Sequence, residues 1–307
     1  MQLSIDARLR RTPACTVIIP TYNRRALLQR TLDQLARQRL PGDTFEVLVV
    51  DDGSSDGTEE TVADFRDRLD VRYFWQPDEG FRAGAARNLG LARARAPVTL
   101  FLDCGVLAHS NCIRAHLASH DAAAAQGLPA AVVGYVLCFD DENQTSREIV
   151  AELRDADIDR YVEMAHGRFS RADVREHIYA LCHDDLSLLD APWVVFWTCN
   201  VSVRTRDLLD QGGFDEAFRT WGAEDVELGY RLHKAGIGLR LSRQALAVHH
   251  PHPFDADAKR AGALANYRYF ARKHGISLTK ALTGDMLADH YRRRQADQAK
   301  AIPKSVR

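Results

Sequence analysis

The sequence predicts an α/β fold with a Rossmann-like, mostly parallel central sheet flanked by helices. Apolar, β-branched runs alternate with segments of helical periodicity between residues 15 and 103, and two of the runs end at acidic residues, Asp52 and Asp103. Strands joined by single helices form parallel sheets, whose ligands bind outside the carboxyl ends of the strands. We therefore expect both carboxylates at a ligand-binding edge.

The first half of the chain shows the most regular alternation. The run CTVIIP (15–20) predicts a strand, and leucines at helical spacing predict a helix over 24–38. FEVLVVDD (45–52) predicts a second buried strand, and the Gly-Ser-Ser-Asp-Gly turn after it supplies cap residues for a helix over 58–68. A strand, a helix and a strand follow at 71–76, 83–95 and 98–103.

The second half is less regular. We expect the polar, charged stretch 140–190 to form helices and mobile loops. The other predicted elements are helices over 111–125, 225–235 and 256–274 and strands over 131–139, 194–204 and 246–250.

Composition and charge narrow the class of protein. With 307 residues, 46% of them hydrophobic, the chain can bury a large core, and 41 basic against 42 acidic residues provide no field that attracts nucleic acid or an anionic membrane. Residues 1–12 lack the apolar run of a signal peptide, and no stretch approaches a membrane span. Six cysteines without a CxxC pair predict buried free thiols. We expect a cytoplasmic protein with no nucleic-acid partner and at most peripheral membrane contact.

Two predicted strand ends carry groups suited to a nucleoside. Pro20-Thr21-Tyr22-Asn23 follows the first strand and offers a hydroxyl and an aromatic ring, and Asp52 in Val50-Asp51-Asp52-Gly53-Ser54 can accept from a base N–H or a ribose hydroxyl. The alternative is that Asp-Gly-Ser forms only a turn with a helix cap.

The segment 78–90 places three glycines and two arginines at the start of a predicted helix. Small residues let the backbone approach a diphosphate, and Arg82 or Arg87 would favour its charge. These glycines follow the third strand, whereas a dinucleotide fingerprint follows the first, which argues against dinucleotide binding. The alternative for Arg87 is a solvated helix position.

Asp103 ends an apolar strand, where an unpaired charge would be costly. A divalent cation such as Mg²⁺ or Mn²⁺ is one partner that would offset this cost; backbone amides or an arginine are the alternative. His249-His250-Pro251-His252 offers a second ligand. Only one of His249 and His250 can face a given side of the strand, and we favour His250; a surface histidine cluster is the alternative, and zinc is disfavoured without a cysteine pair.

A third group of residues combines an aromatic ring with two adjacent carboxylates. Trp221 precedes Glu224 and Asp225, which begin a predicted helix. One carboxylate can deprotonate a hydroxyl while the other binds a neighbouring hydroxyl, and the indole offers a flat face for a sugar ring. The alternative is an acidic helix N-terminus favoured by the macrodipole.

Together these motifs resemble family 2 glycosyltransferases with the GT-A fold, over residues 15–250. The resemblance rests on VIIPTYN (17–23), VDDGSSD (50–56) and ARNLG (86–90), and on GGFD (212–215) with WGAEDVEL (221–228), which is similar to the acceptor-side motif of galactosyl- and N-acetylgalactosaminyltransferases of the chondroitin-polymerase type.

The resemblance implies an inverting enzyme that moves a hexose or N-acetylhexosamine from a nucleotide diphosphate sugar, with UDP the expected carrier, to the hydroxyl of a small molecule or glycan. Residues 13–108 would be the nucleotide-sugar-binding half, 109–254 the acceptor-binding and catalytic half, and 255–307 a helical extension. A nucleotidyltransferase acting on a sugar phosphate and a binding protein without catalysis are the alternatives. Neither the acceptor, the sugar nor the oligomeric state follows from the motifs.

The implied roles fall on matching positions of this chain. Asp225 would be the base, with Glu224 and Trp221 on the acceptor, and Asp103 and His250 would bind Mn²⁺ or Mg²⁺. The family's Asp-x-Asp metal motif appears as Asp103-Cys104-Gly105, without its second carboxylate. Either water fills the gap beside Asp103 and a histidine, which we favour, or the enzyme binds the metal weakly and relies on arginines. The nucleotide would contact Pro20, Thr21, Tyr22, Asn23, Asp52, Arg82, Arg87 and Asp103.

Overall fold

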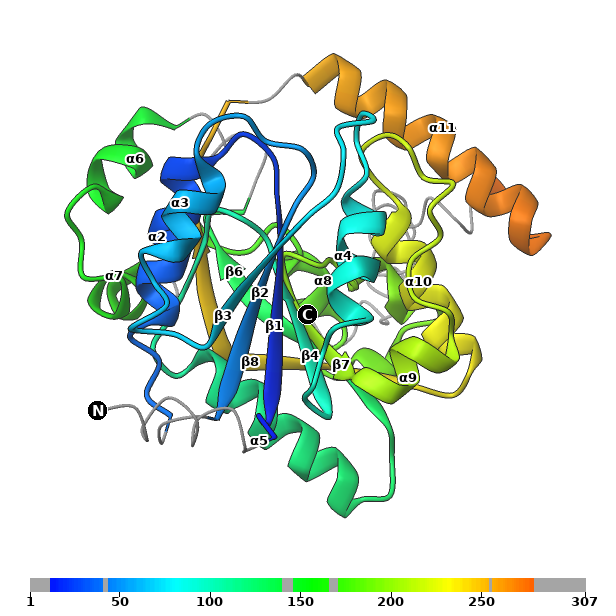
Figure 1. Cartoon of the computed structure of the whole chain (residues 1–307). Helices are drawn as coiled ribbons and strands as arrows, with labels where there is room; N and C mark the ends of the chain where they lie inside the picture. The colour runs from blue at the N-terminus through cyan, green and yellow to red at the C-terminus, as the bar shows by residue number, and fades with distance from the viewer. Residues whose placement is uncertain (1–11, 41–43, 140–145, 166–170, 254–255, 279–307) are drawn as a thin grey trace.

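A single eight-stranded sheet organises the computed structural model, which describes residues 12–40, 44–139, 146–165, 171–253 and 256–278. Its strand order is β3-β2-β1-β4-β7-β6-β8-β5, with helices on both faces (Figure 1). The predictions for residues 1–11, for 140–145 and 166–170 in the polar stretch, and for 279–307 in the C-terminal extension lie outside the described residues.

The N-terminal half forms the predicted parallel β–α alternation. Parallel pairs join β1 to β2 and β4, and β2 to β3, because continuous apolar runs suit strands that are covered on both faces. The strands are β1 (Cys15–Thr21), β2 (Phe45–Asp51), β3 (Val71–Trp75) and β4 (Val98–Leu102), and the helices are α2 (Arg25–Leu35), α3 (Thr58–Ala63) and α4 (Ala83–Leu91). The predicted elements of this half are therefore confirmed.

The C-terminal half makes the sheet mixed. β7 (Asn200–Arg204) pairs antiparallel with β4 and β6 (Ala130–Leu137), β8 (Gly238–His249) runs parallel to β6, and β5 (Val106–Ala108) is antiparallel to β8. Four of the seven strand pairs are parallel, so the sheet is only slightly more parallel than antiparallel.

Two sequence predictions in this half need correction, and two short elements are additional. The strand predicted over 194–204 begins only at Asn200, because Pro192–Val195 form a 3-10 helix that proline at its start favours. β8 begins eight residues before the predicted strand over 246–250, since its polar residues weaken the apolar signal. The short elements β5 and α9 (Thr205–Asp210) were not predicted.

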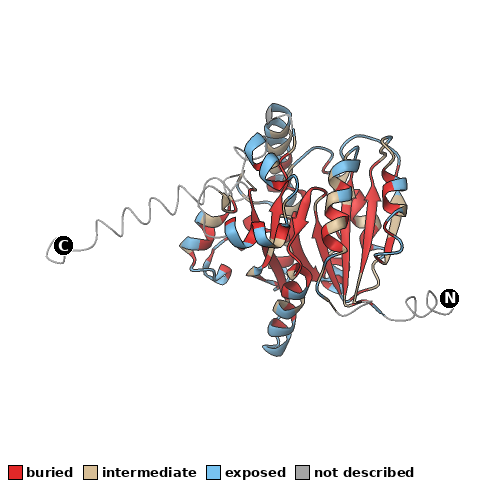
Figure 2. Cartoon of the chain, turned by 90° about the vertical axis from the view of Figure 1, so that its left-hand side faces the viewer, coloured by how far each residue is buried: buried red, intermediate tan, exposed pale blue. Residues whose placement is uncertain are grey.

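The remaining helices surround the sheet. Those not yet named are α5 (Cys112–Ala125), α6 (Arg147–Leu153), α7 (Ile158–Ala165), α8 (Glu176–Leu181), α10 (Glu224–Lys234) and α11 (Ala256–His274). The sheet is buried between them, with one apolar cluster on each of its faces (Figure 2). All six cysteines are buried and free, as predicted. Within the described ranges, no helix combines the length and apolarity that crossing a bilayer requires.

Candidate functional site

The Asp52 carboxylate lies just past the end of β2 and is held by two donors. Gln76 Nε2 donates to Oδ1 at 2.6 Å, and the backbone N–H of Arg82, at the start of α4, donates to Oδ2 at 2.9 Å. Burial raises the pKa of Asp52 above its ordinary value, against the lowering effect of these two hydrogen bonds. Asp52 is therefore a fixed acceptor between two strand ends, as nucleoside recognition requires.

Residues at and just after the end of β1 contribute to the site through both backbone and side chains. Tyr22 is 45% exposed and donates its hydroxyl to Asp78 at 2.7 Å, which leaves its ring open for stacking. Asn23 adopts φ +48° and is held there by Ser54 and Ser55, at 2.7 and 2.9 Å. Pro20, in β1, is partly buried and holds φ for the approach to this turn.

The hydroxyl of Thr21 does not face a ligand. Thr21 is buried, and its hydroxyl donates to Cys104 Sγ at 3.6 Å, while its carbonyl accepts from the backbone N–H of Asp52 at 2.9 Å. The expectation that this hydroxyl is offered to the nucleoside is corrected, because the side chain points into the sheet layer. Thr21 supports the site through its backbone.

Arg87 joins the strand-end side of the site to the start of α10. Its guanidinium donates to Asp103 at 2.9 Å and to Glu224 at 3.3 Å, and lies 5.5 Å from the centre of the Phe214 ring. Burial alone would lower the pKa of Arg87, but the charges of Asp103, Glu224 and Asp225 raise it by more. Arg87 is buried, so the alternative of a solvated helix position is excluded.

Glu224 and Asp225 begin α10 directly after Ala223, which has φ +72°. Asp225 accepts from the backbone N–H groups of Thr198 at 3.2 Å and Val226 at 2.8 Å. Burial, and then the charge of Glu224, raise the pKa of Asp225 to about 7, against the lowering effect of Arg87. Glu224 Oε2 is buried with no hydrogen-bond partner in the described part of the chain, which suits an oxygen that accepts a hydrogen bond from a hydroxyl of a bound molecule.

The side chain of Asp103 is 37% exposed past the end of β4, and one of its oxygens binds Arg87. The two ring nitrogens of His250, the predicted second ligand, face the Pro251 carbonyl at 2.9 Å and Arg30 at 3.4 Å. The ring nitrogens of His252 have similar partners, the Pro253 carbonyl at 3.1 Å and Arg24 at 3.0 Å. Burial and the charge of Arg24 lower the pKa of His252, and the charge of Asp103 opposes them. His249 and His250 have different neighbours: His249 packs against His252, with ring centroids 5.3 Å apart, whereas His250 faces Arg30.

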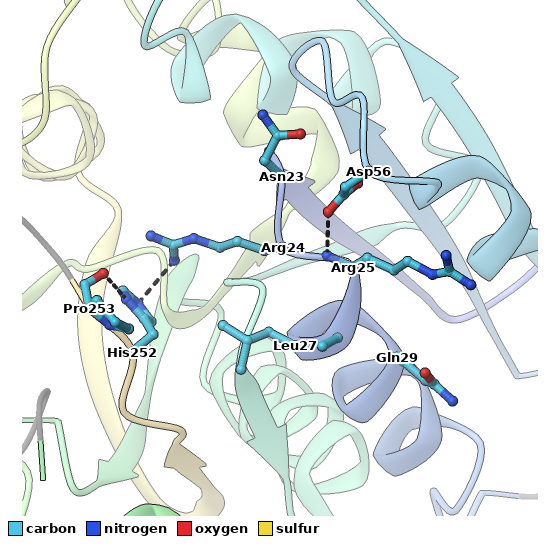
Figure 3. Close-up of a pocket in the computed structure, with 9 residues that line it drawn as sticks. Asn23, Arg24, Arg25, Leu27, Gln29, Asp56, His252 and Pro253 are labelled. Carbon is cyan, nitrogen blue, oxygen red and sulfur yellow. Dashed lines mark hydrogen bonds between the residues drawn. The ribbon is translucent and has the colours of Figure 1, made fainter. Parts of the chain in front are cut away.

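A cavity of about 710 Å³ opens beside His252, at the N-terminus of α2. In Figure 3, Arg24 extends toward His252, whereas Arg25 points the other way and its backbone N–H donates to Asp56 at 2.9 Å. The cavity is lined by Asn23, Arg24, Arg25, Ala26, Leu27, Gln29, Asp56, His252 and Pro253.

Two further predicted contacts have partners within the protein. Arg82 pairs with Glu79 at 3.0 Å, and its Nε is buried with no hydrogen-bond partner among the residues that the structure describes. Trp221 is 44% exposed, and the Lys259 ammonium of α11 lies 4.7 Å from the centre of its ring.

Several residues of the site were missed from the sequence. Gln76 positions Asp52, Thr198 donates to Asp225, and Asn88 exchanges hydrogen bonds with the backbone of Phe214 at 2.7 and 2.9 Å. Asn88 belongs to the ARNLG motif, and it ties α4 to the segment before α10. Gln76 and Thr198 carry no sequence signal, because their partners lie elsewhere in the chain.

Comparison with protein families gives two adjoining matches. Residues 16–188 match the model described as glycosyl transferase family 2, and residues 185–253 match the one described as the N-terminal domain of galactosyltransferase. Among curated proteins, the chain is 42% identical to validoxylamine A glucosyltransferase of Streptomyces hygroscopicus subsp. limoneus over 85% of its own length and 57% of the relative. It is 32% identical to Escherichia coli chondroitin synthase, over 78% of this chain and 35% of that protein. The chain thus spans little more than half the length of the first relative, and about a third of the second.

Solved structures share the fold at low identity. The S. aureus TarS 1-349 complex with UDP-GlcNAc matches with TM-score 0.57 and 18% identity, over 84% of this chain and 66% of that one. The Pyrobaculum calidifontis mannosyltransferase PcManGT, in complex with GDP-Man and Mn²⁺, matches with TM-score 0.58 and 18% identity, over 97% and 81%. From the sequence matches and the shared architecture, the chain belongs to glycosyl transferase family 2 and has the GT-A fold.

Proposed function

We propose that this chain transfers a hexose or N-acetylhexosamine from a UDP-linked donor to an acceptor hydroxyl, with inversion at the anomeric carbon. The junction at Arg87 carries this proposal: one guanidinium contacts Asp103 on the strand-end side and Glu224 at the start of α10. The Asp52 carboxylate accepts from the backbone N–H of Arg82, at the start of the helix α4 that bears Arg87. A nucleotide held near Asp52 would thus extend toward the two carboxylates of α10.

In the proposed reaction Asp225 removes the proton of the acceptor hydroxyl, whose oxygen attacks the anomeric carbon as the bond to the diphosphate breaks. A base with a pKa of about 7 combines an ionised fraction at neutral pH with useful basicity. Glu224 Oε2 accepts a hydrogen bond from a second hydroxyl of the acceptor, and the ring of Trp221 stacks on the sugar. A single displacement inverts the configuration because the acceptor oxygen attacks the anomeric carbon from the face opposite the leaving diphosphate.

A divalent cation, Mn²⁺ or Mg²⁺, is part of the proposal. No three His, Cys, Asp or Glu side chains in the described part of the chain are grouped to hold a metal. Such cations are nevertheless commonly bound by one or two protein ligands plus substrate phosphates and water. We propose Asp103 and His252 as the protein ligands, because the charge of Asp103 acts on the pKa of His252, whereas burial raises the pKa of Cys104 to about 12 and keeps it a neutral thiol. Bound there, the cation would neutralise charge on the leaving diphosphate.

The relatives suggest where to look for substrates. Glucose and validoxylamine A are the first donor sugar and acceptor to try, because the relative at 42% identity is named a validoxylamine A glucosyltransferase. UDP is the first carrier to try, since TarS was solved with UDP-GlcNAc. The six buried free thiols support the cytoplasm as the proposed location.

Product analysis tests the reaction class. With UDP-sugars and an acceptor panel that includes validoxylamine A, we expect release of UDP and an acceptor glycoside of inverted anomeric configuration, measured by coupled UDP assay and NMR. Pyrophosphate from a nucleoside triphosphate and a sugar phosphate would indicate the nucleotidyltransferase instead. Binding of the donor with neither transfer nor hydrolysis would indicate a protein that only binds nucleotide sugars.

Chelation tests the cation. We expect EDTA to suppress transfer and Mn²⁺ to restore it better than Ca²⁺, because the site would combine an imidazole with a carboxylate. The His252→Ala variant should need more Mn²⁺ for half-maximal rate, while His250→Ala should not. Full activity in EDTA would assign Asp103 to binding Arg87 alone.

The pH profile tests the base. Below a pH of about 7 Asp225 is protonated, so we expect log kcat/KM to fall by about one for each pH unit lost. The charge of Glu224 helps to raise the pKa of Asp225, so Glu224→Gln should move this acid limb to lower pH. An acid limb that stays in place in Glu224→Gln would argue against Asp225 as the titrating group.

A further inference from the structure

The helix α11 contacts the site although it lies beyond both family matches, of which the first ends at residue 188 and the second at residue 253. Figure 1 shows it along the outside of the molecule beside α10. Its buried residue Asn266 faces the loop that carries Trp221. Asn266 Nδ2 donates to the carbonyls of Gly222 at 2.7 Å and Thr220 at 2.9 Å, and also lies 3.4 Å from the carbonyl of Trp221.

Small residues bring this loop and α11 into direct contact. A Cβ added at Gly262 would lie 3.0 Å from Thr220 Cβ and 3.1 Å from its hydroxyl oxygen. A Cβ added at Gly222, where φ is +98°, would lie 3.1 Å from the Cβ of Ala263. The loop backbone therefore sits against α11 with no room for a further methyl group, and its position depends on the helix.

The far end of α11 is anchored to the same part of the site. Lys273 donates to Asp215 at 2.7 Å and to Glu227 of α10 at 2.8 Å, and Tyr269 donates to Asp215 at 2.7 Å. These contacts fix α11 relative to α10, the helix that begins with Glu224 and Asp225. A displacement of Asn266 is thus resisted from both sides of the loop.

We infer that Asn266 is a positioning residue for the acceptor: by binding the carbonyls of residues 220–222, it holds Trp221 at the angle to Asp225 that acceptor binding requires. The inference rests on the proposed function and extends it to a helix that the family motifs do not include. Among the described residues, the hydrogen bonds of Asn266 go to residues 220–222 and none goes to Asp52, Asp103 or Arg87, so we confine its role to the acceptor side.

Two substitutions displace the loop in different ways. Asn266→Ala removes the hydrogen bonds, whereas Gly262→Ala adds a methyl group against Thr220 and should favour the helix itself. For both, we expect acceptor KM to rise about tenfold or more, because small misplacements of binding groups are costly. Donor KM and acceptor-free donor hydrolysis should stay within about twofold of the wild type, whereas a general loss of structure would change all of them. Phe270→Leu, in the same helix with its ring 5.4 Å from Tyr230, is the matched control for lost stability.

Amide hydrogen exchange of residues 219–223 supplies a readout independent of catalysis. Faster exchange there in Asn266→Ala, but not in Phe270→Leu, is expected. Unchanged exchange, or an unchanged acceptor KM despite faster exchange, overturns the inference. If the wild type transfers no sugar, the proposed function fails, and the exchange result alone then decides whether Asn266 holds the loop.

Discussion

Replacing Asp225 by Asn is expected to lower kcat by about 10²–10⁴-fold, the usual contribution of a general base. Asparagine keeps the shape of the side chain but cannot take up the hydroxyl proton. Its two backbone donors, at Thr198 and Val226, differ from the donors that hold Asp52, so donor affinity should change little. Steady-state kinetics with the acceptor and a separate titration with UDP measure the two quantities.

Asp210→Asn is the matched control for this experiment. Asp210 ends α9 and pairs with Arg206, at 3.5 Å on an exposed surface. It undergoes the same chemical change without touching the site, so wild-type kinetics are expected. Wild-type turnover in Asp225→Asn would remove this residue from the mechanism, and a parallel loss of UDP binding would mean that the substitution disturbed the whole site.

Replacing Arg87 by Met is expected to cost about 3–5 kcal/mol of unfolding free energy, the range for breaking a buried ion pair from one side. Glu224 would keep a buried charge without its counterion, and Asp225 would lose the nearby charge that lowers its pKa. Asp103 contributes less to the loss, because its carboxylate is partly exposed to water. Urea unfolding at pH 8 measures the change.

The pH dependence of this loss has a defined sign. Without Arg87 the pKa of Asp225 rises further above its unfolded value, so the folded variant gains protons, and relative stability, as pH falls. The destabilisation should therefore shrink from pH 8 to pH 5. Arg206→Met, at an exposed pair, should change stability by no more than about 0.5 kcal/mol. Equal midpoints for Arg87→Met and the wild type would contradict the view that Arg87 neutralises the two α10 carboxylates.

The elements of the N-terminal half could be predicted because their signals are local. A buried parallel strand is a continuous apolar run, and the runs at 15–20, 45–52 and 98–103 coincide closely with β1, β2 and β4. β8 gave a weaker signal, because arginine, serine and glutamine interrupt its apolar residues, and Pro192 turned part of a predicted strand into a 3-10 helix.

The candidate site was predictable by residue type but not by partner. Adjacent carboxylates at a helix start and an arginine in ARNLG indicated Asp225, Glu224 and Arg87. The contact of Arg87 with Glu224 joins residues 137 positions apart, and no local pattern encodes it. The contact of His250 with Arg30 joins residues 220 positions apart and was hidden for the same reason, while the preference for His250 as a metal ligand stays a prediction.

By itself, then, the amino-acid order determined the strand and helix periods, the carboxylates at strand ends and the acidic start of α10, since backbone preference and burial act over a few neighbouring residues. Only the tertiary structure decided that Thr21 turns toward Cys104, that His252 meets Arg24 and that Asn266 binds the Trp221 loop. Such contacts depend on how distant segments pack, and a side chain finds its partner only after the sheet and its covering helices have set the distances between them.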